Sequence, residues 1–206
     1  MAQVMLLHKL DSDSSPLELG TASQPSESLV TLESKRRTLW CAFVIERLLA
    51  NGRDRITILQ MEQITTRLPQ LDEDFIYGRE NSNRTLKDDL IGNPKNREGL
   101  HSHLIRLLKI SGDVMIWHGN GGRYADSICP WLPEMPFSVL DRALQQWRAA
   151  LPNYLDHTPS NLPLILAAGH GKIWIPMFCL FYQAQAILHR EYIPFTSIEG
   201  YDPSHG

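Results

Sequence analysis

The spacing of apolar residues in the segment 137–151 constrains the fold of this chain more than any other feature. The apolar side chains recur at i, i+3, i+4, i+7 and i+11, as they do along one face of an amphipathic α-helix: Leu140, Ala143, Leu144, Trp147 and Leu151. Pro136 stands just before, and proline is favoured at the first position of a helix. We therefore expect a helix over Phe137–Leu151, preceded by an extended proline-rich segment, "CPWLPEMPF".

Apolar residues at helical spacing also occur in four other segments. We expect helices over Ala2–Leu10, Glu27–Ala50, Glu98–His118 and Leu162–Arg190, with a short helical piece at Met61–Arg67 that Pro69 ends. Asn51-Gly52 and the "GNGG" run at 119–122 are helix stops, because glycine adopts the left-handed conformation that often follows a helix. The last helix is almost wholly apolar, which predicts a central, mostly buried helix with a kink near Pro176.

The connecting segments are polar, and strand-like alternation is not convincing anywhere in the sequence. Residues 11–28 are rich in serine, proline and acidic side chains, which predicts an exposed connector, and residues 79–97 are expected to form a loop. The sequence as a whole predicts an all-α fold, an irregular multi-helix bundle with a central apolar C-terminal helix.

Composition excludes several classes of protein. The 206 residues are 43% hydrophobic and carry a formal net charge of −3, so we expect a packed core and no strongly basic surface for DNA. The three cysteines, Cys41, Cys129 and Cys179, are isolated, which excludes a zinc-finger spacing or a disulfide framework. No signal peptide is visible and the longest apolar run is too short to span a membrane, so we predict a soluble intracellular protein.

Catalytic motifs are absent from the sequence. It contains no nucleophile elbow, phosphate-binding loop, dinucleotide fingerprint or zinc-protease motif. His101 and His103 point to different sides of the expected helix, which favours solvated histidines over a metal pair. Cys179 lies in the most apolar stretch, which favours an inert core thiol. The basic run Ser34–Arg37 favours a solvated or ion-paired helix face over a phosphate-binding cluster.

A clamp of arginines and carboxylates is the most specific site that the residues suggest. Arg53 and Arg55 follow the Gly52 turn, and Asp72, Glu73 and Asp74 lie within chain reach of them. Guanidinium and carboxylate groups form planar paired hydrogen bonds, so these residues could fasten the turn to the next segment. A binding site for a small acid or effector is the alternative.

Several blocks of the sequence, in this order and spacing, resemble one known family. The blocks are "MAQVMLLHKL", "RRTLWCAFVIERLLANGRDR", "EQITTRLP" with "DEDFIYGR", "PFSVLDRALQQWRAALP", "HTPSNL" and "ILHREYIPF". They are similar to motifs of the fungal-specific regulatory domain, or middle homology region, of zinc-cluster transcription factors. The similarity covers nearly the whole chain, residues 1–206. The first block is normally internal, so we expect Met1 to correspond to an internal point of longer family proteins and the chain to be a partial domain.

The resemblance implies a regulatory role without DNA binding by this chain. In the family, a six-cysteine zinc cluster reads DNA, and the helical middle region regulates transcription through contacts with other parts of the factor, with co-regulators or with small effectors. With three lone cysteines, the chain has no such cluster, so we expect no cofactor here, zinc only in the family's cluster, and DNA contact only through it. The resemblance also implies a nuclear location, and a homodimer stays open.

Two other functions remain as alternatives. The first is a sensor that holds a small effector between the helices that carry Trp40, Trp117, Trp147 and Trp174, because helical bundles host such pockets. The second is an enzyme, which would need residues brought together from distant segments with no local sign of one another. We therefore expect a regulatory domain and not an enzyme.

Overall fold

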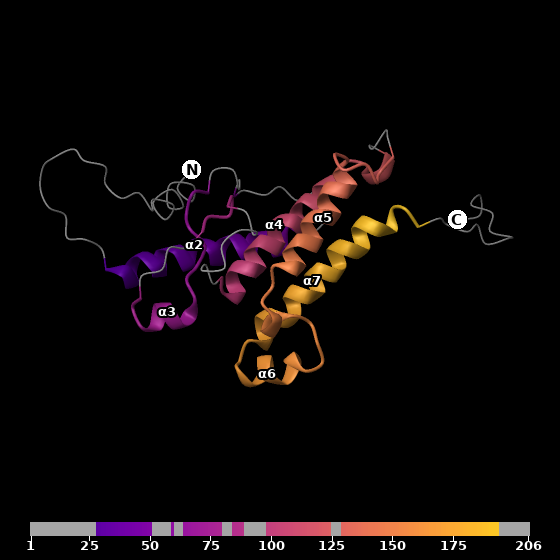
Figure 1. Cartoon of the computed structure of the whole chain (residues 1–206). Helices are drawn as coiled ribbons and strands as arrows, with labels where there is room; N and C mark the ends of the chain where they lie inside the picture. Colours follow the sequence, from indigo (N-terminus) through magenta and orange to yellow (C-terminus); the bar gives the residue numbers. More distant parts are fainter. Residues whose placement is uncertain are drawn as a thin grey trace, which may run out of the picture.

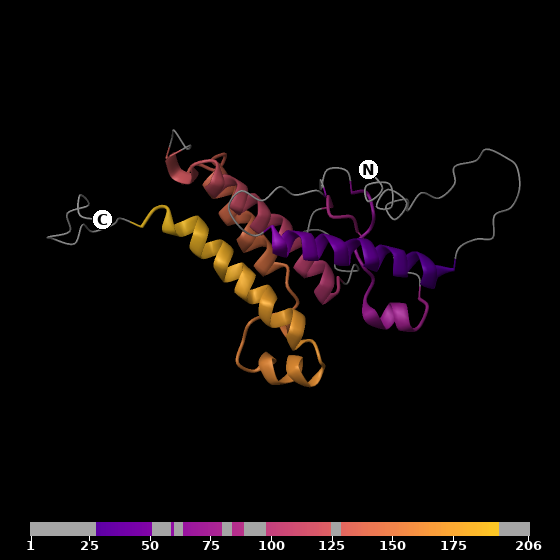
Figure 2. The ribbon, with the colours of Figure 1, turned by 180° about the vertical axis from the view of Figure 1, so that it is seen from behind.

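Six α-helices make up most of the part of the chain that the computed structural model describes, residues 28–50, 59, 64–79, 84–88, 98–124 and 129–193. They are α2 (Leu29–Leu49), α3 (Asp72–Ile76), α4 (Leu100–Gly119), α5 (Pro136–Ala149), α6 (Asn161–Ala167) and α7 (Gly171–Arg190). Figures 1 and 2 show them from opposite sides. No β-strand occurs within these ranges. The all-α, multi-helix prediction is therefore confirmed.

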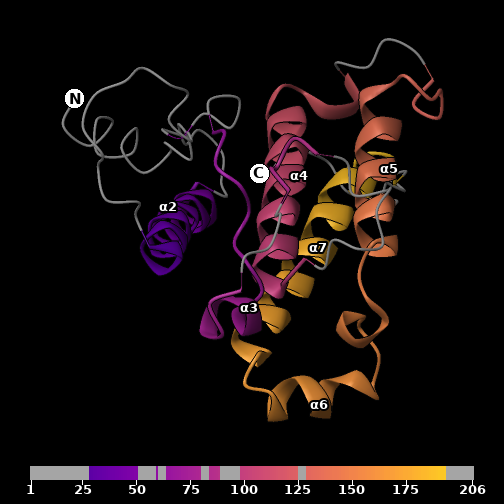
Figure 3. The same cartoon turned by 60° about the vertical axis from the view of Figure 1, so that its left-hand side comes forward.

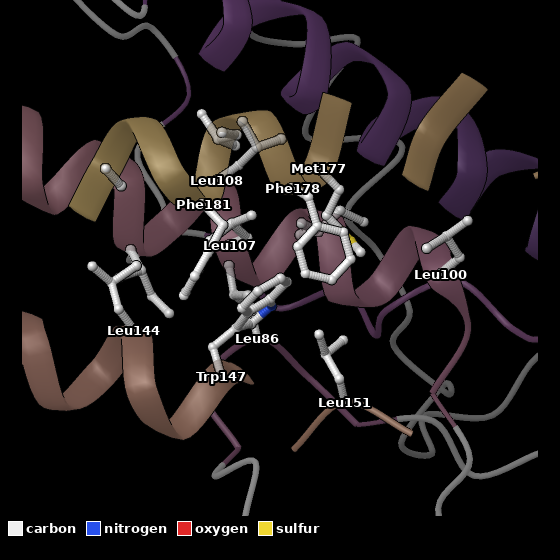
Figure 4. Packing of buried hydrophobic residues seen from close by; sticks show 14 of the residues in the cluster. Leu86, Leu100, Leu107, Leu108, Leu144, Trp147, Leu151, Met177, Phe178 and Phe181 are labelled. Carbon is white, nitrogen blue, oxygen red and sulfur yellow. The ribbon is translucent and has the colours of Figure 1, made fainter. Parts of the chain in front are cut away.

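The helix α4 lies at the centre of the bundle. It packs against α7 and α5 on one side and against α2 on the other, as Figure 3 shows. Residues from every side of α4 are buried, among them Leu107, Val114 and Trp117. Figure 4 shows the core between α4, α5 and α7, where the ring of Trp147 stacks on that of Phe181 with centroids 5.3 Å apart. The C-terminal helix α7 packs against α4, α5 and α6, so it shares the middle of the bundle with α4.

The helix ends follow the local sequence signals. The Ser28 hydroxyl accepts a hydrogen bond from the Thr31 N–H at 3.2 Å and so caps the start of α2. Pro136 is the first residue of α5, as predicted. After α4, Gly121 and Gly122 have φ values of 109° and 52°, a conformation that side chains disfavour, so the "GNGG" helix stop is confirmed.

The last helical region is broken into two helices, whereas the sequence predicted one. Gly169 has a φ of 75° and separates α6 from α7, which is possible because glycine carries no Cβ. The apolar pattern continues across the break, so periodicity alone gave no sign of it. Pro176 lies inside α7, which is assigned as one continuous helix.

The helix α7 is only half buried, which corrects a second expectation. Its buried face carries Trp174, Met177, Phe178 and Phe181, whereas Cys179 on the opposite face is exposed. The expectation of an inert core thiol at Cys179 is therefore wrong. Nearly all side chains of this segment are apolar, and the sequence could not indicate which of them faced α4.

The predicted short helix at Met61–Arg67 is wrong over its described residues, 64–67. This segment is not helical, and Arg67 forms an isolated antiparallel bridge with Thr85. Burial alternates along it, because Ile64, Thr66 and Leu68 are buried and the residues between them are exposed. Branched side chains at this period of two favour extended backbone.

The connectors are described only in part. The proline-rich residues 130–135 form turns and not the extended segment that was predicted, with the Leu132 N–H donating to the Cys129 carbonyl at 3.2 Å. The described part of the 79–97 loop, residues 79, 84–88, contains no helix. The predicted helix at Ala2–Leu10, nearly all of the 11–28 connector and the Gly52 helix stop lie outside the described residues.

Candidate functional site

A buried carboxylate on α2 is the centre of a dense polar cluster. Glu33 is 2% exposed, and its oxygens accept hydrogen bonds from Arg36 and, at 2.9 Å, from Nε of Arg37. Its Oε1 also accepts the backbone N–H of Gln70 at 2.8 Å. Because Arg36 and Arg37 stand three and four residues after Glu33, the helix itself brings the three side chains together. The run Ser34–Arg37 is thus an ion-paired helix face, one of the two forms predicted.

Arg37 extends this cluster to the helix α3. Its Nη1 lies 2.8 Å from Oδ1 of Asp72, its Nη2 donates to the Gln70 carbonyl at 3.0 Å, and its guanidinium lies 4.4 Å from the centre of the Phe75 ring. The planar guanidinium can make these contacts at once, which an ammonium group could not do. Arg37 therefore joins α2 to the start of α3.

The predicted clamp is placed only in part. Arg53 and Arg55 lie outside the described residues, so their pairing stays a prediction, whereas Asp72 is paired with Arg37. Asp72, Glu73 and Asp74 form the first turn of α3, where carboxylates interact favourably with the positive end of the helix dipole. Sequence reasoning missed Arg37 because a basic run on a helix gives no sign of the distant carboxylate that it meets.

The segment between α2 and α3 is held by two further side chains. The indole Nε1–H of Trp40 donates to the Arg67 carbonyl at 2.7 Å, and the hydroxyl of Ser102 on α4 donates to the Pro69 carbonyl at 3.1 Å. Backbone carbonyls of an irregular segment have no helical partner and need such donors when they are buried. Residues 67–70 are thus fastened to α2 and α4.

A second buried arginine, Arg106 on α4, fastens another segment. Its Nε and Nη2 groups bind both oxygens of Glu98 at 2.8 and 2.7 Å, and Nη1 donates to the Asp88 carbonyl at 2.9 Å. Nη2 also lies 3.3 Å from the Thr85 carbonyl. Sequence reasoning missed this residue. A signal was present, since Arg106 interrupts the apolar run between Ile105 and Leu107 and only a paired charge is tolerated there.

The four tryptophans of the predicted effector pocket lie in different parts of the core. Trp147 and Trp174 both pack against the Phe178 ring, with centroids 6.1 and 5.0 Å away, and their indole N–H groups donate to the carbonyls of His103 and Leu155. Trp117 lies by Phe137, with ring centroids 6.5 Å apart. Trp40 packs against Phe43, at 5.4 Å. Among the described residues, Trp147 and Trp174 are the two that share a ring partner.

The histidines of α4 differ from expectation at one position. His103 is buried, 3% exposed, and desolvation lowers the pKa of its imidazole to about 4, against its ordinary value of 6.5. The prediction of a solvated side chain is therefore wrong for His103. Partial burial also lowers the pKa of His101, although the carboxylate of Asp72 opposes that shift. Both imidazoles are neutral near pH 7.

The polar clusters have the chemistry of a structural clamp. Their carboxylates are paired with arginines, and the arginine N–H groups bind backbone carbonyls, so most of the hydrogen-bonding capacity is used within the chain. Within the described ranges, no group of three or more histidine, cysteine or acidic side chains could hold a metal ion. No helix among these residues is long and apolar enough to cross a membrane.

Residues 1–149 match a known family, which is described as the fungal specific transcription factor domain. The match covers well over half of the chain. The chain belongs to this family. The matched segment includes α2, α3, α4 and α5. With them it includes Glu33 and Arg37 of the first polar cluster and Arg106 of the second, which we call the two clamps. The clamps are therefore features of a fungal specific transcription factor domain, which is a class of transcription regulators and not of enzymes.

Curated relatives of this domain are named as transcription regulators. The chain is 44% identical over 59 residues to the sorbicillinoid biosynthetic cluster transcription factor 1 of Penicillium rubens, covering 29% of this chain and 10% of that protein. It is 34% identical over 79 residues to a citrinin biosynthesis transcriptional activator of Monascus ruber, 38% of this chain and 14% of that protein. A Schizosaccharomyces pombe transcriptional regulatory protein, itself uncharacterized, is 26% identical over 155 residues, 66% of this chain and 22% of that protein.

The chain thus spans between a tenth and about a fifth of the length of these relatives. A comparison with solved structures gave no match.

Proposed function

We propose that this chain is the regulatory module of a fungal transcription factor of the zinc-cluster type. It acts in the nucleus and modulates transcription by RNA polymerase II through contacts with other parts of the factor or with co-regulators, and not by reading DNA itself. The observation that carries this proposal is the family match over residues 1–149, in which the matched helices build the two clamps and much of the core. The names of the curated relatives support the same role.

The net charge of the chain supports the proposal that it does not bind DNA directly. Proteins that bind duplex DNA neutralise phosphates with clustered lysine and arginine, whereas this chain has a formal net charge of −3. Arg36, Arg37 and Arg106 are engaged with Glu33, Asp72 and Glu98. These arginines are therefore committed to the fold and have little capacity left for phosphate.

A tethering experiment tests the regulatory role. The full chain is fused to a bacterial repressor that binds its operator upstream of a yeast reporter gene, and reporter output is compared with that of the repressor alone. We expect the fusion to change the output, and the Asp113→Asn fusion to act like it, because that carboxylate forms only an exposed pair with Lys109. The Glu33→Gln fusion should lose the effect with its fold. Output equal to that of the repressor alone would contradict the proposal.

A second experiment tests the proposal that the chain does not read DNA itself. The isolated chain is titrated against random and fungal promoter duplexes in a gel-shift assay at physiological salt. We expect no sequence-selective binding. Sub-micromolar, selective binding would mean that the chain reads DNA by itself, contrary to the proposal.

One observation favours a small effector as a second way of control. The indole Nε1–H of Trp117 is buried with no hydrogen-bond partner among the described residues, at the end of α4 near the Phe137 ring. A buried donor without a partner carries a cost in free energy, which a ligand acceptor could remove. Thermal-shift screening of polar metabolites tests it: a compound that stabilises the chain, but not a Trp117→Phe variant, supports effector binding.

A further inference from the structure

The short helix α6 exposes most of its apolar side chains. Of its seven residues only Ile165 is buried, whereas Leu164 and Leu166 are 66% and 52% exposed. Helices of soluble proteins usually bury their large aliphatic side chains, so exposure of several on one short helix marks a surface that something else covers. The sequence "NLPLIL" offers α6 no polar face to turn toward water.

This apolar surface continues onto the first half of α7. A Cβ atom added at Gly171 would lie 2.6 Å from Cδ2 of Leu166 and 4.0 Å from Cδ1 of Ile175, so both side chains adjoin the same point. Ile175 is 45% exposed, and Cys179 and Tyr182 follow on the same exposed side of α7 at helical spacing. We call this surface the α6–α7 face; its residues are Leu162, Leu164, Leu166, Ile175, Cys179 and Tyr182. Figure 1 shows α6 at one end of the bundle, next to the start of α7.

The charge of the α6–α7 face has one sign. Residues 161–190 include no aspartate or glutamate, and the exposed side chain of Lys172 lies in the first turn of α7. A cation at this end of a helix is unfavourable, because the helix dipole is positive there too. The charge of Lys172 therefore lowers the stability of α7. In the amino-acid sequence, Lys172 lies between Leu166 and Ile175, two residues of the face.

Lys172 forms no ion pair with any residue that the structure describes. Asp156 lies 2.7 Å from Arg148, Asp141 lies 3.0 Å from His189, and Glu191 lies 2.9 Å from His118, so these carboxylates have other partners. The α6–α7 face is thus apolar, with a positive charge beside it that has no ion-pair partner among the described residues.

This charge pattern decides between two occupants. A second copy of the chain, placed on the face by two-fold symmetry, would bring a surface without acidic residues against an identical one. Like charges across an interface are costly, whereas opposite charges steer and orient a partner. An amphipathic helix with leucines on one side and carboxylates at its border matches both the apolar and the charged parts.

We propose that the α6–α7 face binds an acidic, leucine-bearing amphipathic helix of a partner protein, with Lys172 pairing with its carboxylates. The inference names a partner for the regulatory module and rests on the function proposed above. Leu164, Leu166 and Ile175 receive the apolar side of the partner helix, in the manner of other helix-in-groove recognition. The whole face lies beyond the family match, which ends at residue 149.

Two fluorescein-labelled probe peptides of equal length test the proposal on the full chain. One has leucines at helical spacing with glutamates between them, and the other has lysines in place of the glutamates. We expect the glutamate peptide to bind about tenfold more tightly in fluorescence anisotropy, which corresponds to about 1.4 kcal/mol. Bound glutamate peptide should also slow alkylation of Cys179 in a chain whose Cys41 and Cys129 are serine.

Three variants locate the site. Leu164→Ser should weaken the glutamate peptide about tenfold, since it removes an apolar contact from a side chain that bears little on the fold. Lys172→Glu should reverse the preference, so that the lysine peptide binds more tightly. Ile116→Ser is the matched control, because Ile116 is an exposed apolar residue on α4 outside the face, and binding should be unchanged.

Equal binding of both peptides, or an unchanged preference in Lys172→Glu, would overturn the proposal. So would light scattering that shows a dimer which Leu164→Ser dissociates, because a second copy would then be the occupant. In the tethered reporter, regulation that persists in Leu164→Ser overturns the partner site alone. Absence of regulation by the unaltered chain overturns the proposed function, whatever the peptides do.

Discussion

Trp147 on α5 donates its indole N–H to the backbone carbonyl of His103 on α4, and the two atoms lie 2.9 Å apart. The bond brings a fully buried ring against the helix at the centre of the bundle, beside an imidazole that is itself buried. Its position in the core makes His103 sensitive to acid, because protonation would place a charge where no water reaches it.

We predict that acid destabilises the fold through His103. Its folded pKa of about 4 lies below the unfolded value of 6.5, so the unfolded chain binds more protons between these values and stability falls as pH falls from about 6.5 to 4. The loss is on the order of 3 kcal/mol when complete. Urea unfolding at a series of pH values measures it. A His103→Gln variant should show a smaller dependence over the same range, and an equal one would contradict this assignment.

Removal of the buried carboxylate should destabilise the domain strongly. Glu33→Gln leaves Arg36 and Arg37 without their shared counter-charge, so we expect a loss of about 3 kcal/mol in the free energy of unfolding. Asp113→Asn removes a carboxylate from the exposed pair with Lys109 and should cost less than about 1 kcal/mol. Equal losses in the two variants would show that Glu33 does not act as the centre of the cluster.

Arg106 should be irreplaceable by lysine. An ammonium group cannot bind both oxygens of Glu98 and the Asp88 carbonyl together, so Arg106→Lys should cost about 2 kcal/mol and loosen residues 84–88. Hydrogen exchange followed by mass spectrometry measures the second effect, with faster exchange in peptides that cover these residues. Unchanged exchange there would mean that other contacts hold the segment.

The thiol of Cys179 should react in the native state. Because its side chain lies on the exposed face of α7, iodoacetamide should modify it in the folded chain at a rate close to that in urea. A chain with serine at Cys41 and Cys129 isolates this signal. Strong protection in the native state would place Cys179 in a buried position, or under a partner copy.

The folding unit should extend beyond the family match. The helix α7 covers α4, with Phe178, Phe181 and Met177 in the same core as Leu107 and Leu108 (Figure 4). A chain that ends at residue 149 should therefore expose the core, lose its cooperative melt in circular dichroism and aggregate. A chain that ends at residue 193 keeps α7 and should melt like the full chain. A cooperative melt from the shorter chain would refute this boundary.

Sequence reasoning found the long helices because their signals are local. Periodic apolar residues, the helix-start proline Pro136 and the glycine stop that contains Gly121 act within a few residues of the backbone that they set. It failed where the structure depended on distant partners. The burial of His103 depends on what packs against α4, and the exposure of Cys179 depends on which side of an apolar helix meets the core.

The contrast between local signals and distant partners also applies to the candidate site. Asp72 pairs with Arg37 from α2, 35 positions earlier in the chain, a partner that was not predicted, and its pairing with Arg53 or Arg55 stays a prediction. Arg106 was overlooked because Glu98 and the carbonyls of residues 85–88 are brought to it only by folding. Pairing of this kind follows from tertiary structure, and spacing in a single sequence gives little sign of it.

The Trp40 ring is 1% exposed, and its indole N–H binds the carbonyl of Arg67 in the segment that bridges to Thr85. One side chain therefore both fills the core beside α2 and anchors the connector that leads to α3. Loss of the ring would open a cavity in the core and release that connector in the same step.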